Sequence, residues 1–482
     1  MSGYIFVRGA SGKMNGYMVI ALIACLTGCR QSTPLSTQRI ELELPAVWSV
    51  GASSQAANKE WWLSFRAPEI EQWVRDALSH NHDLQIAAIR LERARTEARM
   101  AGFASRPKLD VSVSGEKRQS SFIGLPFGGS GISRYRYESY GTSAGLNWEM
   151  DLWGRIRAGR SIARTEAKAA EYELEAARLS IVAQAVRLWV QLAEAQIQER
   201  LAGESVLLLE QTLLQVKLRL NAGRGNALNV QQTRANLSEA KSTVVQWRIR
   251  SERLARSMEL LAGQTPSGFK LATTELSYLP SLLSGVPAGI PAELLTRRAD
   301  IVAALTRIHA ANLSIAEADA GLLPRVGLTS AVGTSSDELK GLLNGDSLIW
   351  SIGGSLSQTI LFPDEQQARL NSRSLKAEEA VLSYRQKIMA ALHEVETALN
   401  AGSLLSVQRR HNEVAVENAQ KVMALTDQRF ELGLVNAATL LDAQRRLLIS
   451  RSALISVRRA ELENRIDLHL ALGGEISVED AP

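Results

Sequence analysis

The chain has 482 residues, of which 45% are hydrophobic and 22% are charged, so it is too apolar for a disordered protein and too charged for a helical polytopic membrane protein. Lysine and arginine number 55 against 50 acidic residues, and because the two signs are interspersed a nucleic-acid partner is not expected. Six histidines and two cysteines leave little material for a metal site, and no cofactor is expected.

The N-terminus carries an apolar run at 16–26 (GYMVIALIACL), which follows Arg8 and Lys13. This run is too short to span a bilayer, but it has the length of the apolar region of a signal peptide. We therefore predict a signal peptide at residues 1–28, with translation starting at either Met1 or Met14.

The next residues, Leu26-Thr27-Gly28-Cys29, resemble a bacterial lipobox, which is cleaved before its cysteine. The motif predicts that Cys29 carries lipid, an effectively permanent anchor because each buried CH₂ contributes about 0.8 kcal/mol. Arg30, where an aspartate would favour the inner membrane, indicates the outer membrane. The alternative is an ordinary signal peptide followed by an unmodified cysteine.

Pairs of short segments with strand-like alternation occur twice, at 108–115 and 140–152 and again at 325–334 and 347–362. In the second segment of each pair, apolar residues that include Trp148 and Trp350 alternate with small or polar ones. One apolar and one polar face over about ten residues fits a transmembrane barrel strand with water on one side. The alternative is an amphipathic hairpin on a soluble core.

Four strands are too few to close a barrel, for which about eight is the minimum. An open sheet edge in lipid would leave backbone amides and carbonyls unpaired, at several kcal/mol each. If the strands are transmembrane, the chain must therefore oligomerise.

Long helices are predicted where proline is absent, between Pro126 and Pro266 and again after Pro363. Both regions are rich in strong helix formers, and proline costs about 3 kcal/mol inside a helix. We predict helices at 155–220, 226–261, 365–431 and 436–472, with a local interruption of the first at Gly203. Alanines and leucines recur with a period of 3.5 residues, which is typical of a coiled-coil seam.

The two proline-free regions are copies of each other. A shift of 210 positions aligns Arg219-x-x-x-Gly223-x-x-Asn226-Ala227 with Arg429-x-x-x-Gly433-x-x-Asn436-Ala437. Each glycine lies where a helix C-terminus favours a left-handed residue, and each asparagine is a good N-cap for the next helix. The duplication therefore predicts two units, each a long helix, a tight turn and a returning helix.

Several motifs resemble the TolC family of outer membrane efflux proteins, in its lipoprotein branch. The segment 286–301 (VPAGIPAELLTRRADI) is similar to the family's inter-repeat motif, although the family usually has proline at the position of Ala299. The segment 151–155 (DLWGR) matches the strand-to-helix junction of the first repeat. Phe430-x-x-Gly433 and the segment 440–445 (LLDAQR) match the turn and returning helix of the second.

The resemblance implies a fold that is mainly α with membrane β: a duplicated β-β-α-α-type repeat whose homotrimer forms a 12-stranded outer membrane β-barrel continuous with a periplasmic α-helical barrel. Its implied role is passive conduction, in which substrate passes from an inner membrane pump and a periplasmic adaptor protein to the exterior. The implied location is the outer membrane, with a lipid anchor and a large periplasmic extension. Outer membrane lipid is thus an expected partner.

The expected organisation follows from the repeats and the resemblance together. Short helices at 68–102 and 292–321 would complete the helical barrel. The predicted parts are a signal peptide at 1–28, a lipid-anchored segment at 29–66, a first repeat at 67–265, an inter-repeat belt segment at 266–285, a second repeat at 286–474 and a C-terminal tail at 475–482.

Two turns are implied to be the periplasmic tips that contact the adaptor. They consist of Ala222, Gly223 and Arg224 in the first repeat and of Leu432, Gly433 and Leu434 in the second. A second interpretation is that the two glycines serve only as helix caps, and both can hold.

Asp442 matches the family's acidic periplasmic gate residue. Three carboxylates around a narrow aperture would repel one another, raise one another's pKa and attract cations. The alternative is a solvated helix aspartate that pairs with Arg445 or Arg446. The family often has a second acid where this chain has Thr439, and the aromatic-plus-arginine lock of some members falls on Phe430 and Val435.

No enzyme is expected. Residues 141–145 (GTSAG) fit a nucleophile-elbow pattern by letter but lie inside an alternating strand, and His393-Glu394 lacks the second histidine of a zinc-protease helix. The alternative function is a periplasmic adaptor-type coiled-coil lipoprotein, which would have one hairpin flanked by β halves. A third possibility is a purely structural coiled-coil lipoprotein. The transported substrate is not readable from the sequence.

Overall fold

The computed structural model describes residues 45–48, 60–122, 133–266, 279–280, 291–358 and 364–473. The predicted signal peptide, Cys29, the C-terminal tail and most of the belt segment lie outside the described residues. The chain divides into two units, Met1–Arg39 and Ile40–Pro482, and the fold described below is that of the second.

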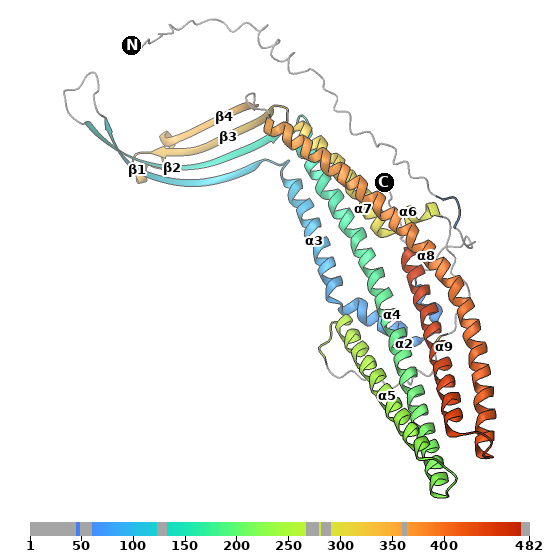
Figure 1. Cartoon of the computed structure of the whole chain (residues 1–482). Helices are drawn as coiled ribbons and strands as arrows, with labels where there is room; N and C mark the ends of the chain where they lie inside the picture. The colour runs from blue at the N-terminus through green and yellow to red at the C-terminus, as the bar shows by residue number, and fades with distance from the viewer. Residues whose placement is uncertain are drawn as a thin grey trace, which may run out of the picture. The chain divides into compact units, whose positions relative to one another are not determined.

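The same order of elements occurs twice along the chain (Figure 1). After the short 3₁₀ helix η1 (Trp61–Phe65), the first copy comprises α2 (Pro68–His80), α3 (His82–Phe103), β1 (Lys108–Phe122), β2 (Ser133–Met150), α4 (Arg155–Asn221) and α5 (Ala227–Leu261). After η2 (Pro291–Glu293), the second comprises α6 (Leu294–Arg297), α7 (Ala299–Ala320), β3 (Arg325–Ser336), β4 (Leu348–Ser357), α8 (Asp364–Glu431) and α9 (Ala437–Leu472). Two short 3₁₀ turns, η3 (Leu339–Gly341) and η4 (Gly345–Ser347), connect β3 to β4. The predicted duplication and the two long hairpins are confirmed.

Three predicted details are wrong. Gly203 does not interrupt α4, which is continuous from Arg155 to Asn221, because one glycine costs only about 1 kcal/mol in so long a helix. The helix predicted at 68–102 is two helices, because the buried Asn81 has an extended backbone, caps α3 through Leu84 N at 2.9 Å and donates to Leu261 O at 2.9 Å. The helix predicted at 292–321 is likewise divided at Arg298.

The four strands form one antiparallel sheet in the order β1-β2-β3-β4, so β1 and β4 are its edges. Both strands of the first pair are longer than predicted. The register brings apolar side chains of all four strands to one face, as in the pairs Leu109↔Leu146 and Val332↔Trp350. This face is exposed, with Trp350 at 73% and Ile352 at 78% exposure, so it is not packed against a soluble core.

The main hydrophobic core lies around the middle of α4. Trp189 of α4 is buried with Trp61 of η1, Ile70 of α2 and Ile466 of α9, so elements of both repeats share this core. Trp61 also stacks on His469 of α9 with ring centroids 4.9 Å apart, and burial lowers the pKa of His469 to about 3, so the imidazole is neutral. None of the helices within the described residues is both long and apolar enough to cross a membrane.

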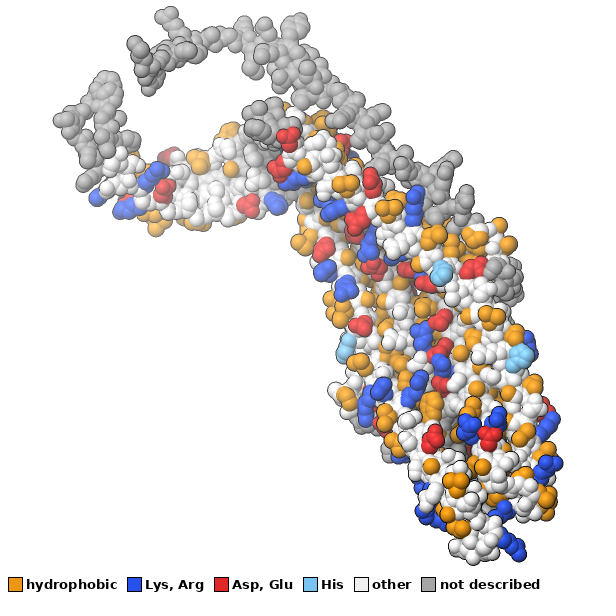
Figure 2. Space-filling model, in the orientation of Figure 1, with side chains coloured by type: hydrophobic (Ala, Val, Ile, Leu, Met, Phe, Trp, Pro, Cys, Tyr) orange, Lys and Arg blue, Asp and Glu red, His pale blue; other side chains and the backbone are white. Residues whose placement is uncertain are grey.

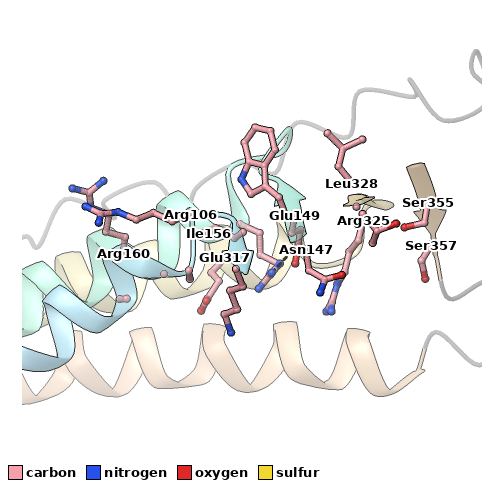
Figure 3. A pocket seen from close by; sticks show the side chains of 18 residues that line it. Arg106, Asn147, Glu149, Ile156, Arg160, Glu317, Arg325, Leu328, Ser355 and Ser357 are labelled. Atoms are coloured by element: carbon pink, nitrogen blue, oxygen red, sulfur yellow. Dashed lines mark hydrogen bonds and ion pairs between the residues drawn. The ribbon is translucent and has the colours of Figure 1, made fainter. Parts of the chain in front are cut away.

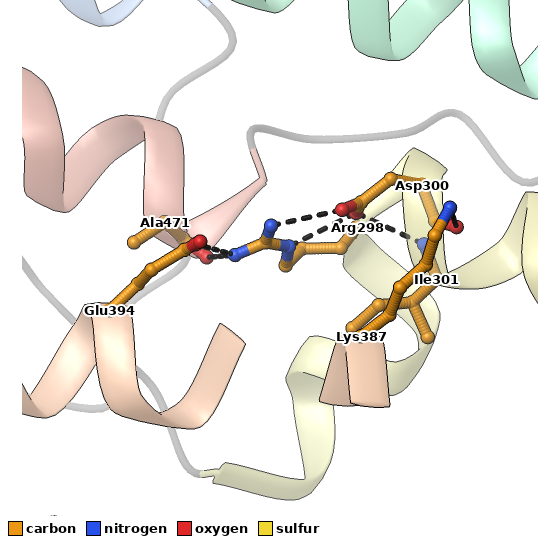
Figure 4. Close-up of polar contacts among 6 residues, drawn as sticks. All are labelled: Arg298, Asp300, Ile301, Lys387, Glu394 and Ala471. Carbon is orange, nitrogen blue, oxygen red and sulfur yellow. Dashed lines mark hydrogen bonds and ion pairs between the residues drawn. The ribbon is translucent and has the colours of Figure 1, made fainter. Parts of the chain in front are cut away.

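Arg298 ties three helices of the second repeat together (Figure 4). Its guanidinium donates to both carboxylate oxygens of Asp300 at 3.0 Å, to Glu394 of α8 at 2.5 Å and to the carbonyl of Ala471 in α9 at 3.1 Å. Gly473 follows with a φ of 84°, and a Cβ there would lie 2.6 Å from Cγ of Arg298. The inter-repeat motif thus has a structural role, because its arginine fixes where α7 meets α8 and the end of α9.

Candidate functional site

The two predicted tips are turns of the same construction. Gly223 and Gly433 have φ values of 68° and 73°, and the amide that follows each glycine donates back to a carbonyl in the last helical turn. Asn226 caps α5 by accepting from Leu228 N at 2.9 Å, and Asn436 caps α9 by accepting from Thr439 N at 2.9 Å. The capping interpretation of the Gly-x-x-Asn motif is therefore confirmed.

The tips also have the exposure that a docking surface needs. Leu432 and Leu434 are 74% and 70% exposed, although both are large apolar side chains, and Ala222, Gly223 and Arg224 are exposed as well. Nothing lies within 4 Å of a Cβ built on either glycine. Contact with an adaptor remains a prediction for these six residues.

The two turns lie side by side and are joined by one arginine. Arg219, at the end of α4, stacks over the Phe430 ring with its guanidinium carbon 3.8 Å from the centroid, and it donates to the carbonyls of Phe430 and Glu431. Residues of both turns line a cavity of about 720 Å³, and the ring of Phe430 is buried together with Val216 and Leu440. The contact of Arg219 with Phe430 and Glu431 therefore holds the two repeats together at their tips, and we call it the clasp.

Sequence reasoning missed this clasp. The family's aromatic-plus-arginine lock falls on Phe430 and Val435, and Val435 packs against the hydrophobic cluster around Phe430. The partner comes from the other repeat. Arg219 and Arg429 occupy equivalent positions of the duplication, so the sequence offered no sign that the first of them reaches across.

Asp442 lies on α9, less than two helical turns from the cap residue Asn436. Its carboxylate accepts from Arg446 at 2.7 Å and from Arg445 at 3.0 Å, and these hydrogen bonds lower its pKa. The pairing given as the alternative is thus present. It leaves the gate role untested, because a paired side chain that is 44% exposed can still face an aperture. Thr439, which stands where the family often has a second acid, hydrogen-bonds the capping asparagine instead.

The DLWGR segment is a compact helix start. Asp151 accepts from the backbone amides of Ile156 at 2.9 Å and Arg157 at 2.8 Å, while Gly154 takes a φ of 81°. Burial opposes ionisation of Asp151, but these two amides and the Arg157 side chain outweigh it and lower its pKa. Trp153 donates to Pro324 O at 2.7 Å, which joins the junction to the start of β3.

We expect Asp151→Ala to lower the free energy of unfolding by about 1–2 kcal/mol, because two amides at the start of α4 lose their acceptor. Since the pKa of Asp151 is lowered on folding, this contribution is present above about pH 4 and is lost as the pH falls further. Urea unfolding at pH 7 and pH 3 measures it. Asp83→Ala, an exposed first-turn aspartate of α3, is the control and should cost less; equal losses would contradict the capping role.

The model of the family described as "Outer membrane efflux protein" matches residues 73–263 and 290–474, which is well over half of the chain. The chain belongs to this outer membrane efflux protein family. The two matched ranges follow the two repeats, and the resemblance carried by the motifs is confirmed.

Relatives of the whole chain agree. The toluene efflux pump outer membrane protein TtgF of Pseudomonas putida is 29% identical over 473 residues, covering 95% of this chain and 96% of TtgF. The cation efflux system protein CusC of Escherichia coli is 27% identical over 457 residues, covering 93% and 96%. The solved outer-membrane channel OprN is similar with a TM-score of 0.81 at 27% identity, covering 89% of this chain and 97% of OprN.

These findings decide between the functions considered. An adaptor-type lipoprotein would have a single hairpin, whereas this outer membrane efflux protein has α4–α5 and α8–α9, and its relatives are named as outer membrane components. The adaptor alternative is therefore wrong. Ser143 of the GTSAG segment lies within β2 and hydrogen-bonds Ser112 of β1 across the sheet at 2.8 Å. The segment is therefore part of a strand and does not form a nucleophile elbow.

Proposed function

We propose that three copies of this chain form an outer membrane channel that passively conducts solutes from an inner membrane pump, through a periplasmic adaptor, to the exterior. Cys29 anchors each copy in the outer membrane by its lipid. The tips at Ala222–Arg224 and Leu432–Leu434 meet the adaptor. Asp442 contributes one of three gate carboxylates.

One observation carries the proposal: the sheet has an exposed apolar face and two open edges. Leu109 and Val113 of β1 and Trp350 and Ile352 of β4 are all more than 60% exposed, so both edge strands are apolar on that face. Such edges are stable in lipid only when they pair with further strands. Copies of the same chain can supply them, and the family resemblance supports a number of three.

The length of the hairpins supports the location of the tips. α4 has 67 residues and α8 has 68, so each is about 100 Å long at 1.5 Å per residue. Each begins close after the sheet and ends at a tip. A sheet held in the outer membrane would thus present the tips about 100 Å away, within reach of periplasmic partners.

Assembly is tested on the mature chain extracted from outer membranes in detergent. We expect a particle of three chains whose migration on electrophoresis changes with heating. Cys29→Ser should lose lipid labelling yet still need detergent, because the apolar sheet face remains. A Cys29→Ser protein that is monomeric and soluble without detergent would overturn the proposal.

Asp442→Ala is expected to weaken the block of channel conductance by divalent cations in planar bilayers, because three carboxylates are removed from one aperture. In the native channel the block should persist at neutral pH, because the hydrogen bonds from Arg446 and Arg445 lower the pKa of Asp442 and oppose the rise that the neighbouring carboxylates cause. It should weaken as acid protonates the carboxylates. Glu365→Gln is the control, because Glu365 also pairs at i,i+4 but lies at the far end of α8. Unchanged block in Asp442→Ala would contradict the gate assignment.

A further inference from the structure

A basic cavity lies where the sheet meets the helices. It has a volume of about 680 Å³, and we call it the basal pocket. Figure 3 shows the side chains that line it, which come from the starts of β1 and β3, the ends of β2 and β4, and the helices α3, α4 and α7. Its basic lining residues are Arg106, Lys108, Arg155, Arg160 and Arg325. Its acidic ones are Glu149 and Glu317.

The two acids offset only two of the five positive charges. Glu149 is engaged by Arg155 at 2.8 Å. Glu317 lies close against α4, because a Cβ built on Gly159 would be 2.8 Å from its Oε1. Among the described residues, no ion pair is made by Arg106, Lys108, Arg160 or Arg325.

Most strand residues of the pocket lie on the polar face of the sheet, whereas Trp148 and Leu328 line it from positions on the apolar face. Lys108 pairs in register with Asn147, and Arg325 with Ser357, and these positions alternate with the apolar positions that pair as Leu109↔Leu146. Since neighbours along a strand point to opposite faces, the two cations point away from the apolar face. Figure 2 shows few charged side chains in the middle of the visible sheet surface, with charges gathered toward its ends.

Cations held close together without counter-charges repel one another, and an anion relieves that repulsion. Guanidinium groups bind carboxylate and phosphate in a two-point geometry, and lysine adds a point charge. The hydroxyls of Thr329, Ser355 and Ser357 line the same cavity and can donate further hydrogen bonds. We propose that the basal pocket binds the phosphate or carboxylate group of a soluble anionic solute on its way through the channel.

The transport role of the basal pocket rests on the proposed channel. Anion binding itself does not, because every lining residue belongs to one chain. In a trimer, the pockets would form three equivalent anion sites where the sheet joins the helical barrel. A phospholipid headgroup offers the same phosphate chemistry. The position on the polar face, opposite the apolar one, favours a soluble solute.

The test is equilibrium dialysis of labelled inorganic pyrophosphate against the detergent-purified mature chain at low salt. We expect saturable binding with one site per chain. Lys108→Gln combined with Arg325→Gln should weaken it at least about tenfold, the effect of losing charge-assisted hydrogen bonds. Arg325→Lys should retain part of the affinity. Lys340→Gln is the matched control, because it removes a lysine beyond the opposite ends of β3 and β4 and should leave affinity unchanged.

The outcomes separate the alternatives. The proposal that the basal pocket binds the anion would be overturned if the double variant bound pyrophosphate as tightly as the native chain. It would also be overturned if Lys340→Gln lost as much affinity as the double variant. Binding that persists in phosphatidylcholine nanodiscs but vanishes with phosphatidylglycerol would show that a lipid headgroup occupies the site and would overturn the solute assignment. Intact pyrophosphate binding by a chain that proves monomeric would overturn the proposed channel and leave the anion site standing.

Discussion

Arg298→Ala is expected to lower the free energy of unfolding by about 3 kcal/mol, because one buried guanidinium serves two carboxylates and a carbonyl. The guanidinium is only 12% exposed, so its removal deprives Asp300 and Glu394 of the cation they share and leaves the Ala471 carbonyl without this donor. Burial lowers the pKa of Arg298, but the two carboxylates outweigh this effect and raise it. Urea denaturation at pH 7 measures the loss.

The neighbouring arginine provides the control. Arg297 makes one i,i+4 ion pair with Glu293 at 2.8 Å, so Arg297→Ala should cost less than about 1 kcal/mol. Acid should bring the native chain and Arg298→Ala closer together. Burial opposes ionisation of Asp300, but Arg298 lowers its pKa, so the stabilisation is present above about pH 4 and is lost as the pH falls through the lowered value. An equal cost for the two substitutions, or a difference unchanged at pH 3, would contradict this account.

Much of the fold was predictable because its signals are local and repeated. The long helices follow from proline-free stretches, and each turn follows from a glycine with positive φ and an asparagine cap, so their bounds agree with the structure within a few residues. Alternation in β2 and β4 also predicted the sheet and its exposed apolar face. Because the same pattern occurs in both repeats, the prediction of an element in one repeat supports the prediction of its equivalent in the other.

The remaining features depend on contacts between segments far apart in the sequence. Asn81 divides a continuous helical pattern because the carbonyl of Leu261, 180 positions away, requires its amide. Arg219 crosses to Phe430, 211 positions away. The basal pocket gathers residues from seven elements, none of which is unusual by itself. Such contacts leave no periodicity or spacing, so sequence patterns do not indicate them.

Duplication also conceals how the two tips differ. In the first turn, a Cβ at Gly225 would lie 2.6 Å from the Leu220 backbone nitrogen, so no side chain fits there. In the second, the equivalent residue is Val435, which packs against the core around Phe430. Both repeats contribute apolar side chains to this core, but only the first supplies the arginine and only the second the ring on which it stacks. The copies have become complementary at their tips.

Phe430→Ala should therefore release the two tips from each other. The ring is 1% exposed, and emptying its site should cost about 3–5 kcal/mol. Because the ring is near the end of α8, we expect the loss as local opening, with faster amide hydrogen exchange at 216–230 and 425–440, while the trimer remains intact. If the proposed channel is correct, its resting conductance in planar bilayers should also rise.

Two milder variants separate packing from the contact with the arginine. Phe430→Leu keeps most of the apolar volume but removes the ring face, and Arg219→Lys keeps the charge but loses the planar group that stacks on the ring and donates to the two carbonyls. Both should increase amide exchange at the tips, though less than Phe430→Ala does. If both exchanged like the native chain while Phe430→Ala did not, apolar packing alone would hold the tips, and the clasp would have no part in keeping the two repeats together.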